Sequence, residues 1–366
     1  MWDEVIDLVP DLSRRTFANP SGSHRAARDA RRILEESRDQ IAEFVGARPS
    51  EVIWCSGGTE ADNLAVAGLG TASPGCDGVV VTSAIEHPAI LESADRRDAR
   101  IVGATAAGLV DLDQLEGALA GDVGLVSIMA VNNEVGTLQP MARIHDLVRE
   151  LAPAAAIHTD AVQAAPWLDL NGVWAQVDAM SLSAHKIGGP KGVGVLVVRD
   201  GTRLVPTLVG GGQERERRSG TQNVVGAAAM AAAVTLTQKH RAETIERVGR
   251  LRDRLIDGLR QRLDGAIETS EPAIKVAGNA HVCISGIESE ALLFLLDRDG
   301  IAASAASSCA SGAQQSSGVL AAIGVSAAWA SGAVRFTLGH TTTDAEIDRV
   351  LEVVPGHVER LRDMGS

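Results

Sequence analysis

The sequence predicts an α/β fold, with a large domain built on a mostly parallel mixed sheet flanked by helices and a smaller α+β domain after it. Three observations support this fold class. Short apolar runs alternate with stretches of helical composition, shorter runs follow one long helical stretch, and 366 residues exceed the usual length of one compact domain. We expect the large domain to span residues 1–240 and the smaller one residues 241–366.

The first expected element is a helix over residues 24–45, where Leu34, Ile41 and Val45 recur at helical spacing near one face. After it come short apolar runs with the length of buried strands: 51–55, 78–83, 124–131, 155–162, 179–185 and 192–199. Helix-forming stretches separate these runs, an alternation typical of parallel strands joined by crossover helices. Ligands then bind at the carboxyl ends of the strands.

The later part of the chain has a different pattern. Residues 226–263 form a long helix-forming stretch, and the runs 280–285 and 333–338 predict shorter strands. We therefore place the domain boundary near residue 240. Residues 302–318 consist of small and polar side chains, a composition typical of a mobile loop.

Composition excludes several classes of protein. The formal net charge of −13 and the pI near 5.2 oppose binding to a phosphate backbone, so we expect no nucleic-acid partner. No apolar run reaches membrane-spanning length and the first residues are acidic, which predicts a cytoplasmic protein without membrane contact. Four cysteines without a C-x-x-C pair predict neither a disulfide framework nor a metal site.

The segment SGGTEADN, residues 56–63, directly follows the first apolar run. Its glycines allow close backbone approach, Thr59 offers a hydroxyl, and the helix expected next points free N–H groups at an anion. A phosphate group fits such a turn. Taken alone the motif is weak, because many turns of this kind are only tight turns and it lacks the Walker lysine.

Two further strand ends carry polar side chains. One run ends at Asp160, and a later one ends at Ser183, His185 and Lys186. The separation is long enough for a crossover helix, so a carboxylate and an amine can face one crevice. A buried ion pair is the alternative. The following GGPKG and the two other polar side chains favour a binding site instead.

This set suits pyridoxal 5'-phosphate (PLP), which needs an amine for a Schiff base, an acid at its pyridine nitrogen and a cradle for its phosphate. Lys186 and Asp160 supply the first two. An aromatic plane normally covers the ring, and since the chain has no tyrosine the candidate is His87, in SAIEHPAI. The alternative for His87 is a capping or hydrogen-bonded surface imidazole. The residues thus predict a PLP enzyme with Lys186 as cofactor anchor.

At this point the chain resembles a known family. It is similar to the cysteine desulfurases, within the class V aminotransferase group of PLP enzymes, whose motifs follow in family order: SGGTEADNLAV, EHPAI, VNNEVGTLQP, HTDAVQA, SAHKIGGPKGVG, GGGQERERRSGT, the loop around SSCASG, and VRFTLGHTTTDAEID. The resemblance covers almost the whole chain from Asn19 onward. It implies the fold type I architecture of PLP-dependent transferases.

The resemblance also implies roles for single residues. Lys186 matches the anchor lysine and catalytic base, Asp160 the pyridine partner, His87 the stacking and catalytic imidazole, and Gln163 the partner of the cofactor's phenolic oxygen. The phosphate ligands match Gly58, Thr59, Ser183, His185 and, from across a homodimer interface, Thr221. The groups that hold the substrate carboxylate match Asn133 and Arg335.

Cys309 matches the family's persulfide-forming cysteine. It stands among Ser, Ala and Gly, as an accessible nucleophile would. Cys55 and Cys283 lie within apolar strands and are interpreted as small buried side chains, and Cys76 as an incidental loop residue.

The implied reaction converts L-cysteine to L-alanine and leaves a persulfide on Cys309 for a sulfur-acceptor protein. That acceptor can serve iron–sulfur cluster assembly, tRNA thiolation or DNA sulfur modification, and the sequence does not choose among them. The Asp-x-x-Ala-Thr-Thr-like segment usual before the part that matches FANPSGSH is absent. Selenocysteine lyase, another class V aminotransferase-type activity and a catalytically weak sulfur-trafficking scaffold therefore stay open as alternatives.

Overall fold

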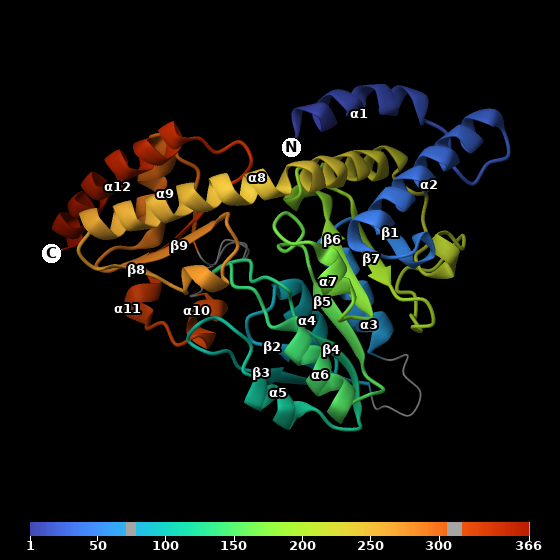
Figure 1. Ribbon diagram of the computed structural model, residues 1–366, viewed down its shortest axis with the longest axis horizontal. Helices are drawn as coiled ribbons and strands as arrows, with labels where there is room; N and C mark the ends of the chain where they lie inside the picture. The colour runs from blue at the N-terminus through green and yellow to red at the C-terminus, as the bar shows by residue number, and fades with distance from the viewer. Residues whose placement is uncertain (71–77, 306–316, 366) are drawn as a thin grey trace. The chain divides into compact units, whose positions relative to one another are not determined.

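The computed structural model describes residues 1–70, 78–305 and 317–365 (Figure 1). These residues form two compact units. Unit 1 comprises Met1–Val102, Leu112–Ala130 and Pro140–Arg241, and unit 2 comprises Gly103–Asp111, Val131–Gln139 and Ala242–Ser366. The division into domains at residue 240 stays a prediction.

Unit 1 is built on a mixed sheet whose strands, among the described residues, have the order β1-β7-β6-β5-β4-β2-β3. The strands are β1 Val52–Cys55, β2 Val79–Ser83, β3 Ala99–Val102, β4 Val123–Ser127, β5 Ala156–Asp160, β6 Ala179–Ser183 and β7 Gly194–Val198. Neighbouring strands from β3 to β6 are parallel, whereas β7 runs antiparallel to both β6 and β1. The predicted mostly parallel sheet is therefore confirmed.

The strand pattern differs from the prediction in two places. The fourth strand ends at Ser127, several residues before the apolar run does. The edge strand β3 was not predicted. Its residues are mostly half-buried or exposed, so it has no continuous apolar run to reveal it.

The helices of unit 1 connect and cover these strands. They are α1 Asp3–Arg15, α2 Arg25–Val45, α3 Gly58–Leu69, α4 Pro88–Asp95, α5 Leu112–Ala118, α6 Met141–Leu151, α7 Leu170–Trp174 and the first part of α8 Val224–Arg262. Helix α3 is rich in Ala, Val and Leu, and its Leu64, Val66 and Leu69 join the core that contains Ile53, Val80 and Leu125 of the sheet. This burial holds the amino-terminal end of α3 at the sheet.

Because β7 is antiparallel to both of its neighbours, β1 runs in the same direction as β6. The carboxyl ends of β1, β2, β5 and β6 therefore lie along one edge of the sheet. Chain segments that leave this edge carry Gly58, His87, Asp160 and Ser183. Parallel strands thus bring together residues that are far apart in the sequence.

In the described part of unit 2, four strands form an antiparallel sheet in the order β10-β11-β9-β8. They are β8 Ala266–Glu268, β9 Asn279–Ile284, β10 Ser304–Ala305 and β11 Ala333–Thr337, and the accompanying helices are α9 Ser289–Arg298, α10 Gly318–Ala322, α11 Ala327–Ala330 and α12 Asp344–Gly365. The two strands predicted in this region correspond to β9 and β11. A bridge between Thr137 and Lys275 joins the segment Val131–Gln139 to the carboxyl-terminal part of unit 2.

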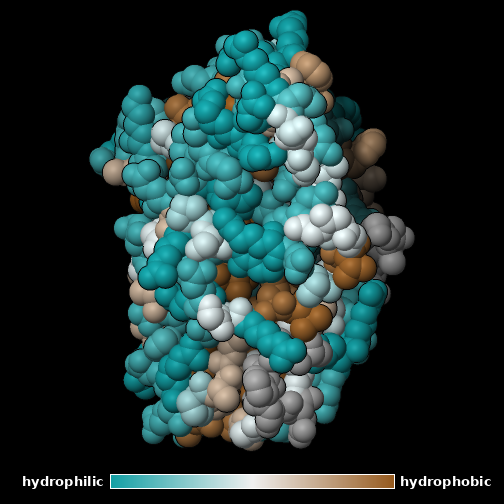
Figure 2. Space-filling model, turned by 90° about the vertical axis from the view of Figure 1, so that its right-hand side faces the viewer, coloured by the Kyte–Doolittle hydropathy of each residue, from teal (hydrophilic) through white to brown (hydrophobic). Residues whose placement is uncertain are grey.

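The surface seen in Figure 2 is mostly hydrophilic, with a small apolar area near its middle. In the portion of the chain that is described, no helix combines the length and apolar character needed to cross a membrane.

The first residues form a helix that packs on α8 (Figure 1). Val5 of α1 is buried against Ala229 and Ala233 of α8. Trp2 contacts the turn after β6: its backbone N–H donates to the carbonyl of Gly188 at 3.0 Å, and its indole Nε1–H donates to the carbonyl of Ile187 at 3.2 Å. The segment before FANPSGSH is thus a helix packed on α8, and Trp2 at its start supports the turn that follows Lys186.

We expect Trp2→Ala to lower the free energy of unfolding by about 2 kcal/mol, because it removes a half-buried ring together with a hydrogen-bond donor. Trp2→Phe should cost about 1 kcal/mol, since Thr237 Oγ1–H still donates to the Ile187 carbonyl at 3.0 Å. Urea unfolding measures both changes. Phe17→Ala is the control, because Phe17 is 79% exposed; an equal loss in Phe17→Ala and Trp2→Ala would contradict the docking role.

Candidate active site

Asp160 is the centre of the polar residues at the sheet edge in unit 1. It is the last residue of β5, it is buried, and its Oδ1 accepts a hydrogen bond from the N–H of Val162 at 2.8 Å. Burial raises the pKa of Asp160, whereas the Val162 N–H and the positive charges of His87 and Lys186 act to lower it. His87 and Lys186 therefore lie close enough to Asp160 for their charges to act on its carboxyl group.

A buried polar layer lies next to Asp160. His158, two residues earlier on β5, forms hydrogen bonds of 2.9 Å through Nδ1 to Ser127 Oγ of β4 and through Nε2 to Ser181 Oγ of β6. Burial lowers the pKa of His158 to about 3, so the ring is neutral. Asp62 Oδ1 of α3 lies 3.9 Å from His158 Nε2. Burial, and after it the charge of Asp160, raises the pKa of Asp62. This layer links β4, β5 and β6 next to Asp160.

His87 is held by the turn that carries it. Its neighbour Glu86 is buried and accepts hydrogen bonds from Ser83 Oγ at 2.5 Å and from the N–H of Met129 at 3.0 Å. Burial raises the pKa of Glu86 to about 8. His87 caps α4, since its Nδ1 accepts from the N–H of Ala89 at 3.1 Å. In the neutral ring the proton therefore sits on Nε2.

At Gly58, the turn between β1 and α3 packs closely against the segments that follow β5 and end β6. A Cβ added to Gly58 would lie 3.0 Å from Val162 Cγ2 and 3.5 Å from Ser183 Cβ. A Cβ on Gly194 would lie 2.7 Å from the carbonyl carbon of Gly57, so β7 also needs glycine here. The first N–H groups of α3 thus lie close to the end of β6, as an anion site at a helix amino terminus requires.

Hydrogen-bond donors surround this turn. Ser183 Oγ and His185 Nδ1 are 2.9 Å apart. Burial, followed by the charges of Lys186 and Lys191, lowers the pKa of His185. Thr59 is exposed on the first turn of α3. A phosphate here would accept from the helix, from two hydroxyls and from an imidazole, so the donor set fits a phosphate.

Lys186 also belongs to unit 1. It ends a short 3-10 helix, Ala184–Lys186, directly after β6, and it is exposed. Gly188 follows with φ +81°, a value suited to glycine, and the Trp2 ring fills the space that a Cβ would occupy. An accessible amine, a buried carboxyl and a phosphate cradle together fit the chemistry of PLP. Gln163 lies half-buried in the turn after Asp160.

Unit 2 contains the two residues predicted to hold a carboxylate. Arg335 of β11 donates through Nη1 to the backbone carbonyl of Asn133 at 2.8 Å. Arg335 Nε and Asn133 Oδ1 are buried atoms without a hydrogen-bond partner among the described residues. His281, opposite Arg335 on β9, is neutral because burial and the charges of Lys275 and Arg335 lower its pKa to about 3. A ligand that offers complementary oxygens would satisfy the guanidinium.

Among the cysteines, Cys309 and Cys76 lie outside the described residues. Cys55 and Cys283 are buried, as the apolar runs around them indicate. Burial raises the pKa of both thiols, that of Cys283 to about 11. Neither thiol is a thiolate at neutral pH, so neither is a candidate nucleophile.

Sequence reasoning missed the residues that hold this site in place: Trp2, Asp62, Glu86 and His158. For His158 and Glu86 a signal was present, because polar residues interrupt or directly follow apolar strands at these positions. Their partners lie on other strands, which no local pattern reveals.

Comparison with known proteins places this geometry in a family. The sequence pattern described as "Aminotransferase class-V" matches residues 1–350. The "IscS-like cysteine desulfurase" of Mycobacterium tuberculosis is 42% identical over an alignment of 361 residues, which covers 95% of this chain and 91% of that protein. The "Cysteine desulfurase" of Gluconacetobacter diazotrophicus is 39% identical, over 98% of this chain and 91% of its own.

Solved structures agree with the sequence matches. A "NIFS-LIKE PROTEIN" superposes with a TM-score of 0.92 at 32% identity, covering 99% of this chain and 97% of its own. "SspA in complex with cysteine" superposes with a TM-score of 0.78 at 28% identity, covering 94% of this chain and 97% of its own. The predicted fold class and family are confirmed: the chain belongs to the class V aminotransferase family, among relatives named cysteine desulfurases.

Proposed function

We propose that this chain is a cysteine desulfurase, an enzyme that uses PLP to remove sulfur from L-cysteine, forms L-alanine and leaves a persulfide on Cys309. The observation that carries the proposal is the buried Asp160, influenced by the charges of Lys186 and His87, on a chain whose relatives are named cysteine desulfurases. Fold alone would not distinguish this activity from others in the family.

PLP, when bound, supplies an electron sink for chemistry at the α-carbon of an amino acid. Lys186 would hold it covalently, Asp160 would keep its ring nitrogen protonated, and His87 would cover the ring. The remaining contacts would come from Gln163 to the phenolic oxygen, and from Gly58, Thr59, Ser183 and His185 to the phosphate. Thr221 of a second copy would complete the phosphate site, which makes the enzyme a homodimer.

The protein residues share the proton and sulfur transfers. Arg335 and Asn133 would hold the carboxylate of L-cysteine, and the Lys186 amine would take its α-proton. The Cys309 thiolate would attack the substrate sulfur, so that a sulfur–sulfur bond forms as the carbon–sulfur bond breaks. His87, through Nε2–H, or Lys186 would return a proton to carbon, which releases L-alanine.

The persulfide then passes to a sulfur-acceptor protein. The net charge of −13 supports an acceptor protein over direct contact with a nucleic acid. A scaffold of iron–sulfur assembly or an enzyme of tRNA or DNA modification fits this role.

Wild-type protein should form alanine from L-cysteine under reductant, and Lys186→Ala should form none above background, because the variant lacks both anchor and base. Amino-acid analysis of the reaction mixture measures alanine directly. A sulfur-trafficking scaffold would bind PLP yet give equal alanine in both proteins, and that outcome would overturn the proposed activity.

Cys309→Ser should keep the visible absorption of lysine-bound PLP and lose sulfide release from L-cysteine by at least about a hundredfold, because a hydroxyl is a poor nucleophile toward sulfur. Cys76→Ser is the matched control and should behave as wild type. Retained sulfide release in Cys309→Ser would assign sulfur removal to another group, as a lyase mechanism requires.

Arg335→Lys should raise the KM for L-cysteine about tenfold or more, because a lysine cannot present the planar pair of donors that a carboxylate accepts. Cofactor absorption should not change, since Arg335 belongs to unit 2 and the predicted cofactor ligands of this chain belong to unit 1. Steady-state kinetics and absorption spectra separate the two effects. An unchanged KM would remove Arg335 from the substrate site.

A further inference from the structure

The loop between β7 and α8 presents Thr221 in an unusual way. Thr221 itself is exposed, but both of its neighbours are held by side chains from one dipeptide. Gln213 Oε1 accepts from the N–H of Gly220 at 2.8 Å, and Glu214 Oε1 accepts from Nε2 of Gln222 at 3.1 Å. The backbone before Thr221 and the side chain of the residue after it are thus held in place, while Thr221 itself is exposed.

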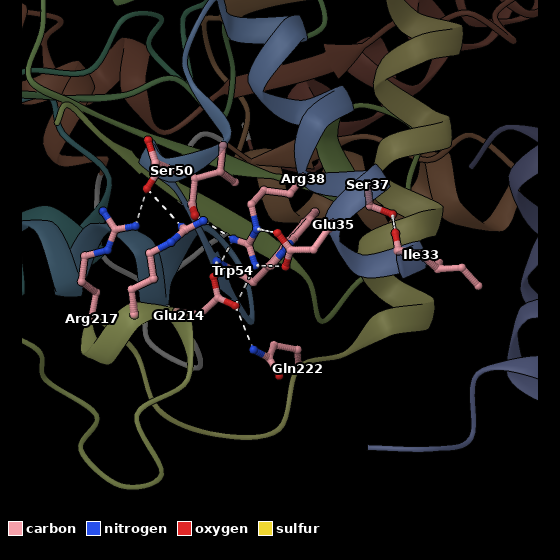
Figure 3. A network of polar contacts seen from close by, with 11 residues as sticks. Ile33, Glu35, Ser37, Arg38, Ser50, Trp54, Glu214, Arg217 and Gln222 are labelled. Carbon is pink, nitrogen blue, oxygen red and sulfur yellow. Dashed lines mark hydrogen bonds and ion pairs between the residues drawn. The ribbon is translucent and has the colours of Figure 1, made fainter. Parts of the chain in front are cut away.

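Glu214 is itself held by a buried ion pair with Arg38, which Figure 3 shows. Arg38 of α2 donates to Glu214 through Nη1 at 2.7 Å and through Nη2 at 3.0 Å, and both side chains are almost fully buried. Glu214 also accepts from the N–H of Trp54, and Arg38 donates to the carbonyl of Val52, both on β1. Burial acts to raise the pKa of Glu214, but the hydrogen bonds and charge of Arg38 lower it overall. The carboxylate is therefore fixed to the sheet.

The backbone at this anchor is strained. Glu214, Arg215 and Glu216 have φ values of 49°, 57° and 65°, although none of them is glycine. Left-handed backbone is unfavourable for such residues and persists only where the surroundings enforce it. A buried ion pair is weak evidence for a purely stabilising role, and it is better suited to fix one geometry.

A second contact joins this loop to the turn between β1 and α3 of the same subunit, where the phosphate is proposed to bind. Arg218 donates through Nε to Glu60 Oε1 at 2.6 Å and through Nη2 to Oε2 at 3.1 Å. Glu60 also accepts from the N–H of Ser56, at the start of that turn. The loop is therefore fixed at two points, with Thr221 presented to solvent beyond the second.

We propose that Gln213 and Glu214, anchored by Arg38, are positioning residues that hold the exposed Thr221 hydroxyl ready for the cofactor phosphate of a second copy of this chain. The inference rests on the proposed function, which assigns Thr221 to a partner's phosphate. Fixing a ligand group before binding lowers the conformational entropy lost on binding and so increases affinity. These three residues, here called the clamp, thus act on the partner's cofactor site and not on the site of their own subunit.

The first test compares Glu214→Gln with the matched control Glu216→Gln, the same change at an exposed position two residues away. Apo protein is titrated with PLP, and the Kd is read from the absorption of the lysine-bound cofactor. We expect Glu214→Gln to raise the Kd about tenfold or more, because one hydrogen bond to a charged phosphate becomes poorly placed. The control should keep the wild-type Kd, and equal Kd values in both variants would overturn the proposal.

Glu214→Gln leaves buried Arg38 without its charge partner and can impair folding, so a gentler variant accompanies it. The double substitution Gln213→Ala, Gln222→Ala keeps the ion pair and removes the two contacts beside Thr221. With circular dichroism and dimer dissociation unchanged, its Kd for PLP should still rise. A wild-type Kd in this folded double variant would likewise refute the clamp.

The second test uses mixed dimers, purified through two different tags, of one Glu214→Gln subunit and one Lys186→Ala subunit. The intact loop of the Lys186→Ala subunit then serves the only site that retains the lysine. We expect this site to bind PLP with the wild-type Kd and each mixed dimer to form alanine at about half the wild-type rate. A Kd as weak as that of the Glu214→Gln homodimer would show that the clamp acts on its own site, and a monomeric protein would also exclude the proposal.

The wild-type protein separates this inference from the proposed function. If wild type binds no PLP and makes no alanine, the proposed function fails. If wild type does both and the variants match it, only the clamp fails.

Discussion

The burial of Asp160 is the constraint on which the rest of the site depends. A carboxyl group taken out of water must be neutral or must be compensated by hydrogen bonds and positive charge. Here the Val162 N–H and the charges of His87 and Lys186 offset part of that cost, and the pKa of Asp160 stays raised. A protonated ring nitrogen beside Asp160 would complete the compensation, so the same burial that makes the apo carboxyl costly favours binding of a pyridinium.

The surroundings of Asp160 make this arrangement rigid. His158 links the neighbouring strands through two serine hydroxyls, and Glu86 links the turn of His87 to the segment after β4. These buried polar groups are largely satisfied, which is the condition under which polar groups in a core define a single geometry. The strand ends that carry the proposed catalytic groups are therefore held in place by these buried contacts.

Parts of the chain distant in sequence from Asp160 hold other loops in place. Trp2 buttresses the turn after Lys186, and the Arg38–Glu214 pair fixes the loop that carries Thr221. Unit 2 contributes a separately formed feature, the contact of Arg335 with Asn133, in which buried polar atoms await a ligand. If these groups bind cofactor and substrate as proposed, their fixed positions reduce the entropy lost on binding.

The sequence by itself determined the α/β class, the helix over 24–45, and the placement of Asp160 and Lys186 at neighbouring strand ends, because apolar periodicity and strand-end polarity are local patterns. The role of Cys309, outside the described residues, still rests on sequence resemblance. Only the tertiary structure decided the reversal of β7, the docking of Trp2 and the pairing of Arg38 with Glu214. Each depends on which distant segments the folded sheet brings into contact, and the spacing of residues along the chain does not contain that information.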